Sequence, residues 1–495
     1  MGINVAYQNS RHRNRLVVIP VVEDAFANLF KDLTPSRSTP VQLELADPKI
    51  HLNLERELGA EFHRNVYNMP FLLDAAGAPW KEANGFFLDL IDGQNARKRP
   101  TDLARRKAAH LLDYKLFCEK EGLDWLDFSG SRRAHRPTFK YFRHLGDESK
   151  ISQAVLNQKT ATIYQFYNYV ASNWHDIDME RVDTCRDIKI LVNGSRGNIL
   201  LETTKRSQTV QRPPTPEVRL GYVREHGEEL RPLTNKELNE FLSVLKGSSW
   251  SQMERLITTI AITTGARKQT ILTLRHRHLQ QMIERGPEKN GSYRLHVGPG
   301  SGVDTKFGKR QILYFPAHLI HQLAVFAASE YSRVRLNRFR ATFHESFPDL
   351  DIPREDNTYL FLSERGNCFY MSKEDPRYPF VRSPPIGQIT DNIKRKLLKQ
   401  TSPNFPRDFT FHWLRATFGY LLYQWLLPFL QDGSLKIGEE IELIQRRMHH
   451  EHRKTTENYL KLYSGFNEKI FTQEIFESKI FDWGDELFCM SEAWR

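Results

Sequence analysis

The sequence predicts a multidomain protein that is mainly α-helical and carries a small antiparallel β-sheet. The chain has 495 residues, more than one hydrophobic core usually organises, so we expect roughly two to four domains. Long segments repeat apolar side chains at the spacing of amphipathic helices. Residues 292–316 instead show the alternating pattern of strands, interrupted by turns that contain Gly and Asp. This pattern predicts the small antiparallel sheet.

The N-terminal region, residues 1–77, has a mixed pattern. RLVVIPVV at 15–22 predicts a strand, TPSRSTP at 34–40 predicts a turn, and residues 53–66 predict a helix. The sequence assigns this region no chemistry.

Residues 78–185 predict a helical, basic domain. Helical periodicity covers residues 80–93, 101–122 and 152–174. The third of these segments carries an aromatic stripe, which we interpret as core packing rather than as a surface for stacking on a ligand.

Residues 186–230 have the composition of a linker, with the stretches NGSRGN and QRPPTPE. A second domain is expected over residues 231–465, followed by a C-terminal tail over 466–495. The tail is acidic but carries several apolar side chains. We therefore expect it to dock either on a neighbouring protomer or on its own domain.

The second domain begins with a clear helix signal. Thr234 precedes Glu237 by three residues, which is the spacing of a capping box. The next long helix, MERLITTIAITTGA, is expected to break at Gly265. After the sheet of residues 292–316, further helices are expected to about residue 465.

The charge balance favours a polyanionic partner. The chain has 71 Lys and Arg against 60 Asp and Glu, a net charge of +11. Basic clusters such as ARKRP and SRVRLNRFR recur along the chain instead of forming one tail. Each cluster alone could be a solvated helix face, but together with the interleaved aromatics they suggest contact with a nucleic-acid backbone.

Other classes of protein fit the sequence poorly. The four cysteines are far apart and show no paired ligand spacing, so neither a disulfide framework nor a zinc ribbon is expected. The longest apolar run, residues 420–430, is too short for a bilayer and contains Gln424 and Pro428. The first residues lack a signal peptide and a myristoylation signal. We expect a protein of the cytoplasm, without a membrane partner.

Three histidines crowd the stretch MHHEHRKTTENYL, residues 448–460. A metal site is the first hypothesis, but HHEH lacks the separation that puts two histidines on one helix face. A second stretch, FTFHWLRATFGYLL, places His412 and Arg415 three residues apart. That pair alone is a weak signal, because H-x-x-R occurs three times in this chain.

The order of the sequence motifs along the chain, and the spacing within them, make a specific signal out of motifs that are weak one by one. The series TTGARKQTILTL, TKFGKRQ, HWLRATF and MHHEHRKTTENYL closely resembles the motif series of the tyrosine recombinase, or phage integrase, family. In that family an arginine motif, a turn lysine, H-x-L-R-x-T and a histidine nine residues before a tyrosine follow in this order. The resemblance covers 231–465 well, matches 78–185 only in its helical, basic character, and fails before residue 78.

The resemblance implies a role for each matching residue. Arg267 and Arg415 would clamp a phosphate, Lys306 would be the turn lysine, and Tyr459 the nucleophile. The histidine partners would be His412 and His450. The resemblance further implies an enzyme that needs neither metal nor ATP, with double-stranded DNA as partner, a dimer on each site and a tetramer in synapsis. It also implies that residues 78–185 bind DNA.

Two positions depart from the family pattern. Thr270 stands where an acidic residue usually supports the first arginine, so the anchoring of Arg267 is open. His449 stands where a glycine is usual. Neither change removes an acting group.

The implied chemistry suits these residue types. Guanidinium groups stay charged and bind phosphate oxygens through two parallel hydrogen bonds, which lysine cannot do. A tyrosine hydroxyl, with a pKa of about 10, needs nearby positive charge and a proton acceptor, for which His412 is our candidate. A lysine on a mobile turn can protonate the leaving 5′ oxygen.

Two other functions remain open from the sequence. A type IB topoisomerase uses a similar catalytic set, although the separate basic helical domain favours site-directed strand exchange. A sequence-specific DNA-binding protein could keep the fold without the chemistry. The sequence names neither the DNA site nor the direction of the reaction.

Overall fold

The chain forms two compact units, residues 1–216 with 379–382 and residues 217–378 with 383–495. Each unit buries its own cluster of apolar side chains. The predicted tail, residues 466–495, lies outside the described part of the chain. The computed structural model describes residues 14–23, 25, 28–30, 41–43, 52–55, 65–94, 97–147, 151–194, 197–211, 218–219, 221–225 and 227–463.

Two small antiparallel sheets open the first unit. The predicted strand over 15–22 is confirmed as β1 (Leu16–Val22), which pairs with β5 (Val66–Leu72). The other sheet has the order β2-β4-β3. Its strands are β2 (Asn28–Phe30), β3 (Val41–Leu43) and β4 (Leu52–Glu55).

The helix predicted over residues 53–66 is wrong where the structure describes it. Residues 53–55 belong to β4 and Val66 begins β5. Because β4 pairs with both β2 and β3, contacts distant in sequence outweigh the local helical pattern there. Residues 56–64 and the turn predicted at 34–40 lie outside the described residues.

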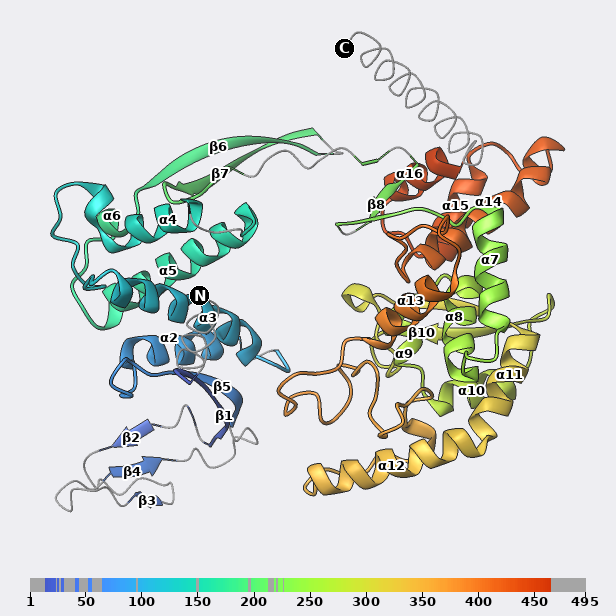
Figure 1. The fold of residues 1–495 in the computed structure, drawn as a ribbon, viewed down its shortest axis with the longest axis horizontal. Coiled ribbons are helices and arrows are strands. Elements are labelled where there is room, and N and C mark those ends of the chain that lie inside the picture. Colours follow the sequence, from blue (N-terminus) through green and yellow to red (C-terminus); the bar gives the residue numbers. More distant parts are fainter. Residues whose placement is uncertain are drawn as a thin grey trace, which may run out of the picture. The chain divides into compact units, whose positions relative to one another are not determined.

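Helices make up most of the rest of the first unit (Figure 1). All three predicted helical segments between residues 80 and 174 are confirmed. The aromatic stripe of the third segment takes part in core packing, since Phe166 and Tyr167 are buried and Phe166 contacts Trp80, Phe86 and Tyr167. The helices are α2 (Lys81–Asp92), α3 (Thr101–Lys120), α4 (Pro137–Asp147), α5 (Gln153–Asn173) and α6 (Met179–Val182), with a 3-10 turn at Arg133–His135.

The range expected as a linker contains regular structure. A long antiparallel hairpin joins β6 (Cys185–Gly194) to β7 (Gly197–Arg206), with Gly194 opposite Gly197 at its tip. A second, short hairpin joins β8 (Val223–Glu225) to β9 (Glu228–Leu230). Paired strands replace the irregular connection that the Gly- and Pro-containing composition suggested.

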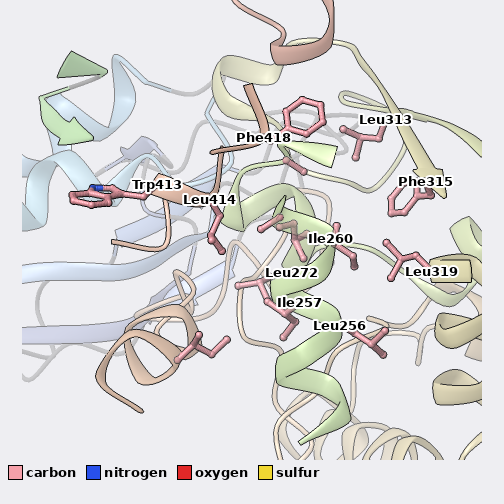
Figure 2. Close-up of a cluster of buried hydrophobic side chains, with 14 of the residues drawn as sticks. Leu256, Ile257, Ile260, Leu272, Leu313, Phe315, Leu319, Trp413, Leu414 and Phe418 are labelled. Atoms are coloured by element: carbon pink, nitrogen blue, oxygen red, sulfur yellow. The ribbon is translucent and has the colours of Figure 1, made fainter. Parts of the chain in front are cut away.

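The second unit is built around α8 (Gln252–Thr264). Figure 2 shows Ile257 and Ile260 of this helix among side chains from other elements, including Leu414 and Phe418. All four side chains are buried in the larger core cluster. The helices are α7 (Asn235–Lys246), α8, α9 (Lys268–Leu272), α10 (His276–Arg285), α11 (Ala317–Ala328), α12 (Glu330–Ser346), α13 (Ile389–Gln400), α14 (Trp413–Gln431), α15 (Glu439–Met448) and α16 (Arg453–Tyr463).

Local signals in the second unit were predicted correctly. The capping box of Thr234 and Glu237 starts α7, with both reciprocal hydrogen bonds in place. The predicted sheet is the antiparallel pair β10 (Ser292–Val297) and β11 (Gln311–Pro316). The fold is therefore mainly helical with small antiparallel sheets, as predicted. None of the helices in the described ranges is long and apolar enough to cross a membrane.

Candidate active site

Arg267 reaches the site because α8 ends at a glycine. Gly265 caps α8 in the left-handed conformation (φ +66°), and a Cβ there would lie 2.5 Å from the Phe418 ring. The chain turns sharply and places Arg267 just before α9. Its guanidinium pairs with the Glu225 carboxylate, with 2.5 Å between Nη2 and Oε1.

Arg415, on α14, is buried, with its side chain only 2% exposed. Nη1 donates to the Gly265 carbonyl at 2.7 Å, and Nη2 donates to the Met448 carbonyl. Nε faces Glu225 Oε2 at 3.8 Å. Arg415 therefore joins the ends of α8 and α15 and points its Nε at the carboxylate that Arg267 binds.

Tyr459, on α16, is buried and also faces Glu225. Its hydroxyl donates to Glu225 Oε2 at 2.6 Å. Burial raises the pKa of Tyr459 well above its ordinary value, and the negative charge of Glu225 raises it further. In this arrangement the phenol is held as a neutral hydrogen-bond donor.

His450 lies against the face of the Tyr459 ring, with 5.1 Å between ring centroids. His450 Nδ1 bonds the Thr456 hydroxyl at 3.0 Å, while the buried Nε2 has no hydrogen-bond partner in the described structure. Burial, and after it the charge of Arg415, lowers the pKa of His450 to about 3. The ring is therefore neutral at physiological pH.

His449, where a glycine is usual in the family pattern, ends α15 in the left-handed conformation, with φ of +53°. His adopts this conformation more readily than most residues other than glycine. The sharp turn is therefore kept without glycine, and it delivers His450 to Tyr459.

His412 comes directly before α14, on the side of the site that faces the hairpin of β8 and β9. Its Nδ1 lies 3.2 Å from Glu228 Oε2, and its Nε2 lies 3.8 Å from Glu225 Oε2. This Nε2 is buried and has no hydrogen-bond partner among the described residues.

Lys306 begins the 3-10 turn Lys306–Gly308 between the two strands of the small sheet. Burial, and after it the charge of Arg267, lowers the pKa of the Lys306 ammonium. Its neighbour Lys309 lines the same cavity but forms an ion pair with Glu451. The two lysines that the sequence left close together therefore differ in their partners.

Thr270, at the position where the family pattern has an acid, anchors the turn of Lys306 instead of an arginine. Its hydroxyl donates to the Asp304 carbonyl at 3.0 Å, and the Thr273 hydroxyl accepts from Asp304 N at 2.9 Å. The helix after Arg267 and the turn that carries Lys306 are thus held together by two hydrogen bonds.

Glu225 was missed by sequence reasoning. Burial alone would raise the pKa of its carboxyl, but the charges of Arg415, His412 and Arg267 hold this pKa well below its ordinary value. It lies within the range expected as a linker, and no motif marks it. The only sequence signal is the density of glutamates in VREHGEEL, residues 223–230.

The six residues singled out in the sequence therefore come together. Arg267, Arg415, His412 and Tyr459 face Glu225, His450 stacks on Tyr459, and Lys306 shares a cavity with Arg267, Glu225 and His450. This cavity has a volume of about 250 Å³. In the described ranges, no group of three or more His, Cys, Asp or Glu side chains is placed to hold a metal ion. The cavity is lined by Arg224, Glu225, Arg267, Lys306, Phe307, Lys309, Gln311, His449, His450, Glu451, His452 and Thr455.

Comparison with known proteins finds similar solved structures. One is the Tn1549 transposon integrase in complex with transposon right-end DNA, with 15% identity and a TM-score of 0.37 over 76% of this chain and 93% of that one. Another is the XerH site-specific recombinase bound to a palindromic difH substrate, with 14% identity and a TM-score of 0.37 over 78% and 87%. A third is the integrase from mycobacterium phage Brujita, with 12% identity and a TM-score of 0.25 over 78% and 91%.

These similar structures are those of integrases and a site-specific recombinase. No protein-family model and no curated protein sequence matches the chain. The roles assigned to the six residues stay predictions.

Proposed function

We propose that this chain is a site-specific DNA recombinase that cleaves and rejoins strands through a covalent 3′-phosphotyrosyl bond to Tyr459. One observation carries the proposal: the hydroxyl of Tyr459 and the guanidinium groups of Arg267 and Arg415 converge on a single anion, the Glu225 carboxylate. A nucleophile and two permanent cations that face one anionic position are the groups that attack on a phosphodiester requires.

The two arginines supply the electrostatic part of the mechanism. During attack, negative charge grows on the non-bridging oxygens of the phosphate, and Arg267 and Arg415 neutralise it. Arg415 is almost fully buried and Arg267 is 14% exposed, so both act where water screens little. Because the hydrogen bonds of Arg415 to two carbonyls fix its position, little reorganisation is needed as the reaction proceeds.

Proton transfer completes the step. The Tyr459 oxygen forms a bond to phosphorus while the bond from phosphorus to the 5′ oxygen breaks. His412 takes the phenolic proton, and Lys306 gives a proton to the departing 5′ oxygen. The lowered pKa of Lys306 suits a proton donor. Rejoining is the reverse sequence with another 5′ hydroxyl, and the phosphotyrosyl ester keeps the energy of the broken bond.

The proposal is tested by trapping the adduct. Bound sites would first be selected from a random-sequence duplex pool, and one site would then be nicked just downstream of the cleavage position, so that the short released piece with the 5′ hydroxyl diffuses away. We expect the wild-type protein to remain joined to DNA under denaturing conditions, with the phosphate on Tyr459 by peptide mapping. Tyr459→Phe should bind the same duplex and form no adduct.

Tyr463 provides the matched control. It lies four residues later on α16, is also buried, and donates its hydroxyl to the Ala416 carbonyl at 3.0 Å. Tyr463→Phe should therefore still form the adduct. A phosphate mapped to Tyr463 would overturn the assignment of the nucleophile. Binding without any adduct would favour a DNA-binding protein, and relaxation of supercoiled DNA without site selection would favour a type IB topoisomerase.

A further inference from the structure

The hairpin of β8 and β9, residues 223–230, makes unusual contacts with the candidate active site. It carries three glutamates, Glu225, Glu228 and Glu229, and is called the acidic hairpin below. We propose that the acidic hairpin is an internal occupant of the phosphate site, and that a DNA phosphate must displace the Glu225 carboxylate before Tyr459 can react. The inference rests on the proposed function, because it concerns regulation of the same site.

The Glu225 carboxylate occupies the position between Tyr459 and Arg267 that a reacting phosphate would take. One oxygen accepts from the Tyr459 hydroxyl at 2.6 Å and the other pairs with Arg267 at 2.5 Å. The carboxylate thus bridges the nucleophile and the clamp, as two oxygens of a bound phosphate would. Since the two anions would also repel each other in a buried site, Glu225 and the scissile phosphate are alternatives.

The site has more donors than the carboxylate uses. Arg267 Nε and Arg415 Nε are buried donors without a hydrogen-bond partner among the described residues, and His412 Nε2 and His450 Nε2, which donate or accept according to the tautomer, also lack one. Leaving such donors unpaired is costly in a folded protein, and native structures usually satisfy them. A tetrahedral phosphodiester presents more acceptor oxygens than a carboxylate, so it can satisfy donors that Glu225 leaves open.

A second glutamate of the hairpin holds another catalytic candidate. Glu228 Oε2 lies 3.2 Å from His412 Nδ1. The third, Glu229, points elsewhere and pairs with Arg219 and Arg224. Two of the three carboxylates therefore engage groups that the proposed reaction needs, whereas the third provides an internal comparison.

A direct catalytic role for Glu225 fits less well. A general base should have a pKa near the working pH, but the pKa of Glu225 lies well below its ordinary value, because Arg415, His412 and Arg267 more than offset the effect of burial. The charge of Glu225 also raises the pKa of Tyr459, which opposes formation of the nucleophile. The remaining alternative is a permanent structural support for the two arginines.

Binding of a small anion distinguishes a Glu225 carboxylate that phosphate displaces from one that permanently supports the two arginines. The full-length protein would be titrated with inorganic phosphate, with thermal unfolding in chloride buffer as the readout. We expect Glu225→Gln to reach half-maximal stabilisation at a phosphate concentration about tenfold lower than wild type. Glu229→Gln, which removes the same charge from the same hairpin, should match wild type. Adding Arg267→Ala to Glu225→Gln should remove the gain.

Other outcomes of the phosphate titration also decide whether the proposal holds. An unchanged phosphate response in Glu225→Gln, or an equal gain in Glu229→Gln, would overturn the proposal. If Glu225→Gln fails to fold in chloride, its refolding is tested in phosphate. Refolding in phosphate would mean that Glu225 occupies an anion site. Failure to refold would mean that Glu225 is a structural support for the arginines, and would overturn the proposal. Glu225→Asp, which keeps the charge on a shorter side chain, should show a smaller gain in the same direction.

The covalent adduct distinguishes this inference from the proposed function. On the nicked duplex, Glu225→Gln should form the adduct at lower DNA concentration than wild type, whereas a structural support would require slower formation. If no variant and not even wild type forms an adduct, the proposed function fails. The phosphate titration would then still establish whether Glu225 occupies an anion site.

Discussion

Two buried carboxylates of the second unit, Glu225 and Asp375, have the same kinds of partner but differ in how completely those partners are satisfied. Asp375 binds Arg377 through both of its oxygens, at 3.0 and 2.8 Å, and accepts from the Tyr359 hydroxyl at 2.7 Å. Ser372 N in turn donates to the Tyr359 oxygen at 2.9 Å. Both Asp375 oxygens, the Tyr359 hydroxyl and the Nε and Nη2 atoms of Arg377 thus all have hydrogen-bond partners.

The Glu225 cluster also combines a carboxylate, arginine and tyrosine, but the Nε atoms of its Arg267 and Arg415 have no hydrogen-bond partner among the described residues. Arg377 has no such spare donor, because its Nε binds Asp375. A cluster that serves stability alone has no reason to leave buried donors open. In the described part of the chain, buried Nε atoms without a hydrogen-bond partner also occur at Arg255, Arg275, Arg294 and Arg335. The difference therefore teaches that open donors mark a cluster built to receive a ligand where they lie beside a nucleophile and a carboxylate, rather than by themselves.

Replacing one arginine in each cluster should give opposite outcomes. Arg267→Ala should slow adduct formation about 10²- to 10³-fold, because charge on the phosphate oxygens stays unneutralised, with little loss of fold. Arg377→Ala should destabilise the second unit by about 3–5 kcal/mol, because it leaves the Asp375 carboxylate buried and unpaired. Single-turnover cleavage and thermal unfolding measure the two effects.

The contrast between the two clusters would be wrong if Arg267→Ala and Arg377→Ala had the same effects on cleavage and stability. Equal loss of stability in both variants would mean that Arg267 is a structural residue. Normal cleavage by a well-folded Arg267→Ala would remove that arginine from the reaction.

How far the sequence predicts this site depends on the separation of the contacts. Gly265, the spacing of His412 and Arg415, and the distance from His450 to Tyr459 are local features, and each was read from a short stretch. The partnership of Glu225 with Tyr459 joins residues 234 positions apart. No periodicity or turn signal near Glu225 points to that partner.

The same reasoning explains the fold predictions. The helices of the second unit were predictable because capping boxes, such as those at Thr234 and Ser251, and helical spacing depend only on residues that are close in the sequence. Residues 53–55 were assigned to a helix but form a strand, because pairing with two distant strands decides their conformation. The hairpins within 186–230 likewise depend on pairing that composition does not encode.

Lys306 and Lys309 allow a second comparison, between two lysines of the candidate active site. Lys306→Ala should slow cleavage of ordinary DNA about 10²-fold, because the 5′ oxygen leaves poorly without a proton. Replacing that bridging oxygen by sulfur, which departs unprotonated, should restore nearly wild-type cleavage. Arg267→Ala should gain little from the sulfur. Lys309→Ala, whose ammonium pairs with Glu451, should cleave both substrates normally.

The pattern of rescue locates the proton donor. Rescue of Lys309→Ala instead of Lys306→Ala would move the acid by three residues along the turn. Absence of rescue in both would exclude the lysines, and His412 would be the next group to replace.

The smallest expected effect concerns acid stability. The folded-state pKa values of Glu225 and Asp375 are both lowered, because their arginine partners outweigh the effect of burial. A carboxyl with a lowered folded-state pKa stabilises the protein above its unfolded pKa of about 4, and this contribution is lost as the pH falls toward the folded value. Glu225→Gln and Asp375→Asn should therefore each lose about 1–3 kcal/mol at pH 7 and less at pH 3.

Inorganic phosphate should then distinguish the two variants. In thermal unfolding at pH 7, phosphate should restore most of the stability of Glu225→Gln, because the anion can neutralise Arg267 and Arg415 in place of the carboxylate. Asp375→Asn should recover nothing comparable, because Arg377 binds residue 375 through Nε and Nη2 and the Tyr359 hydroxyl also donates to it. Equal recovery in both variants would show that phosphate acts on the whole protein, and the contrast between a satisfied cluster and a receptive one would have to be abandoned.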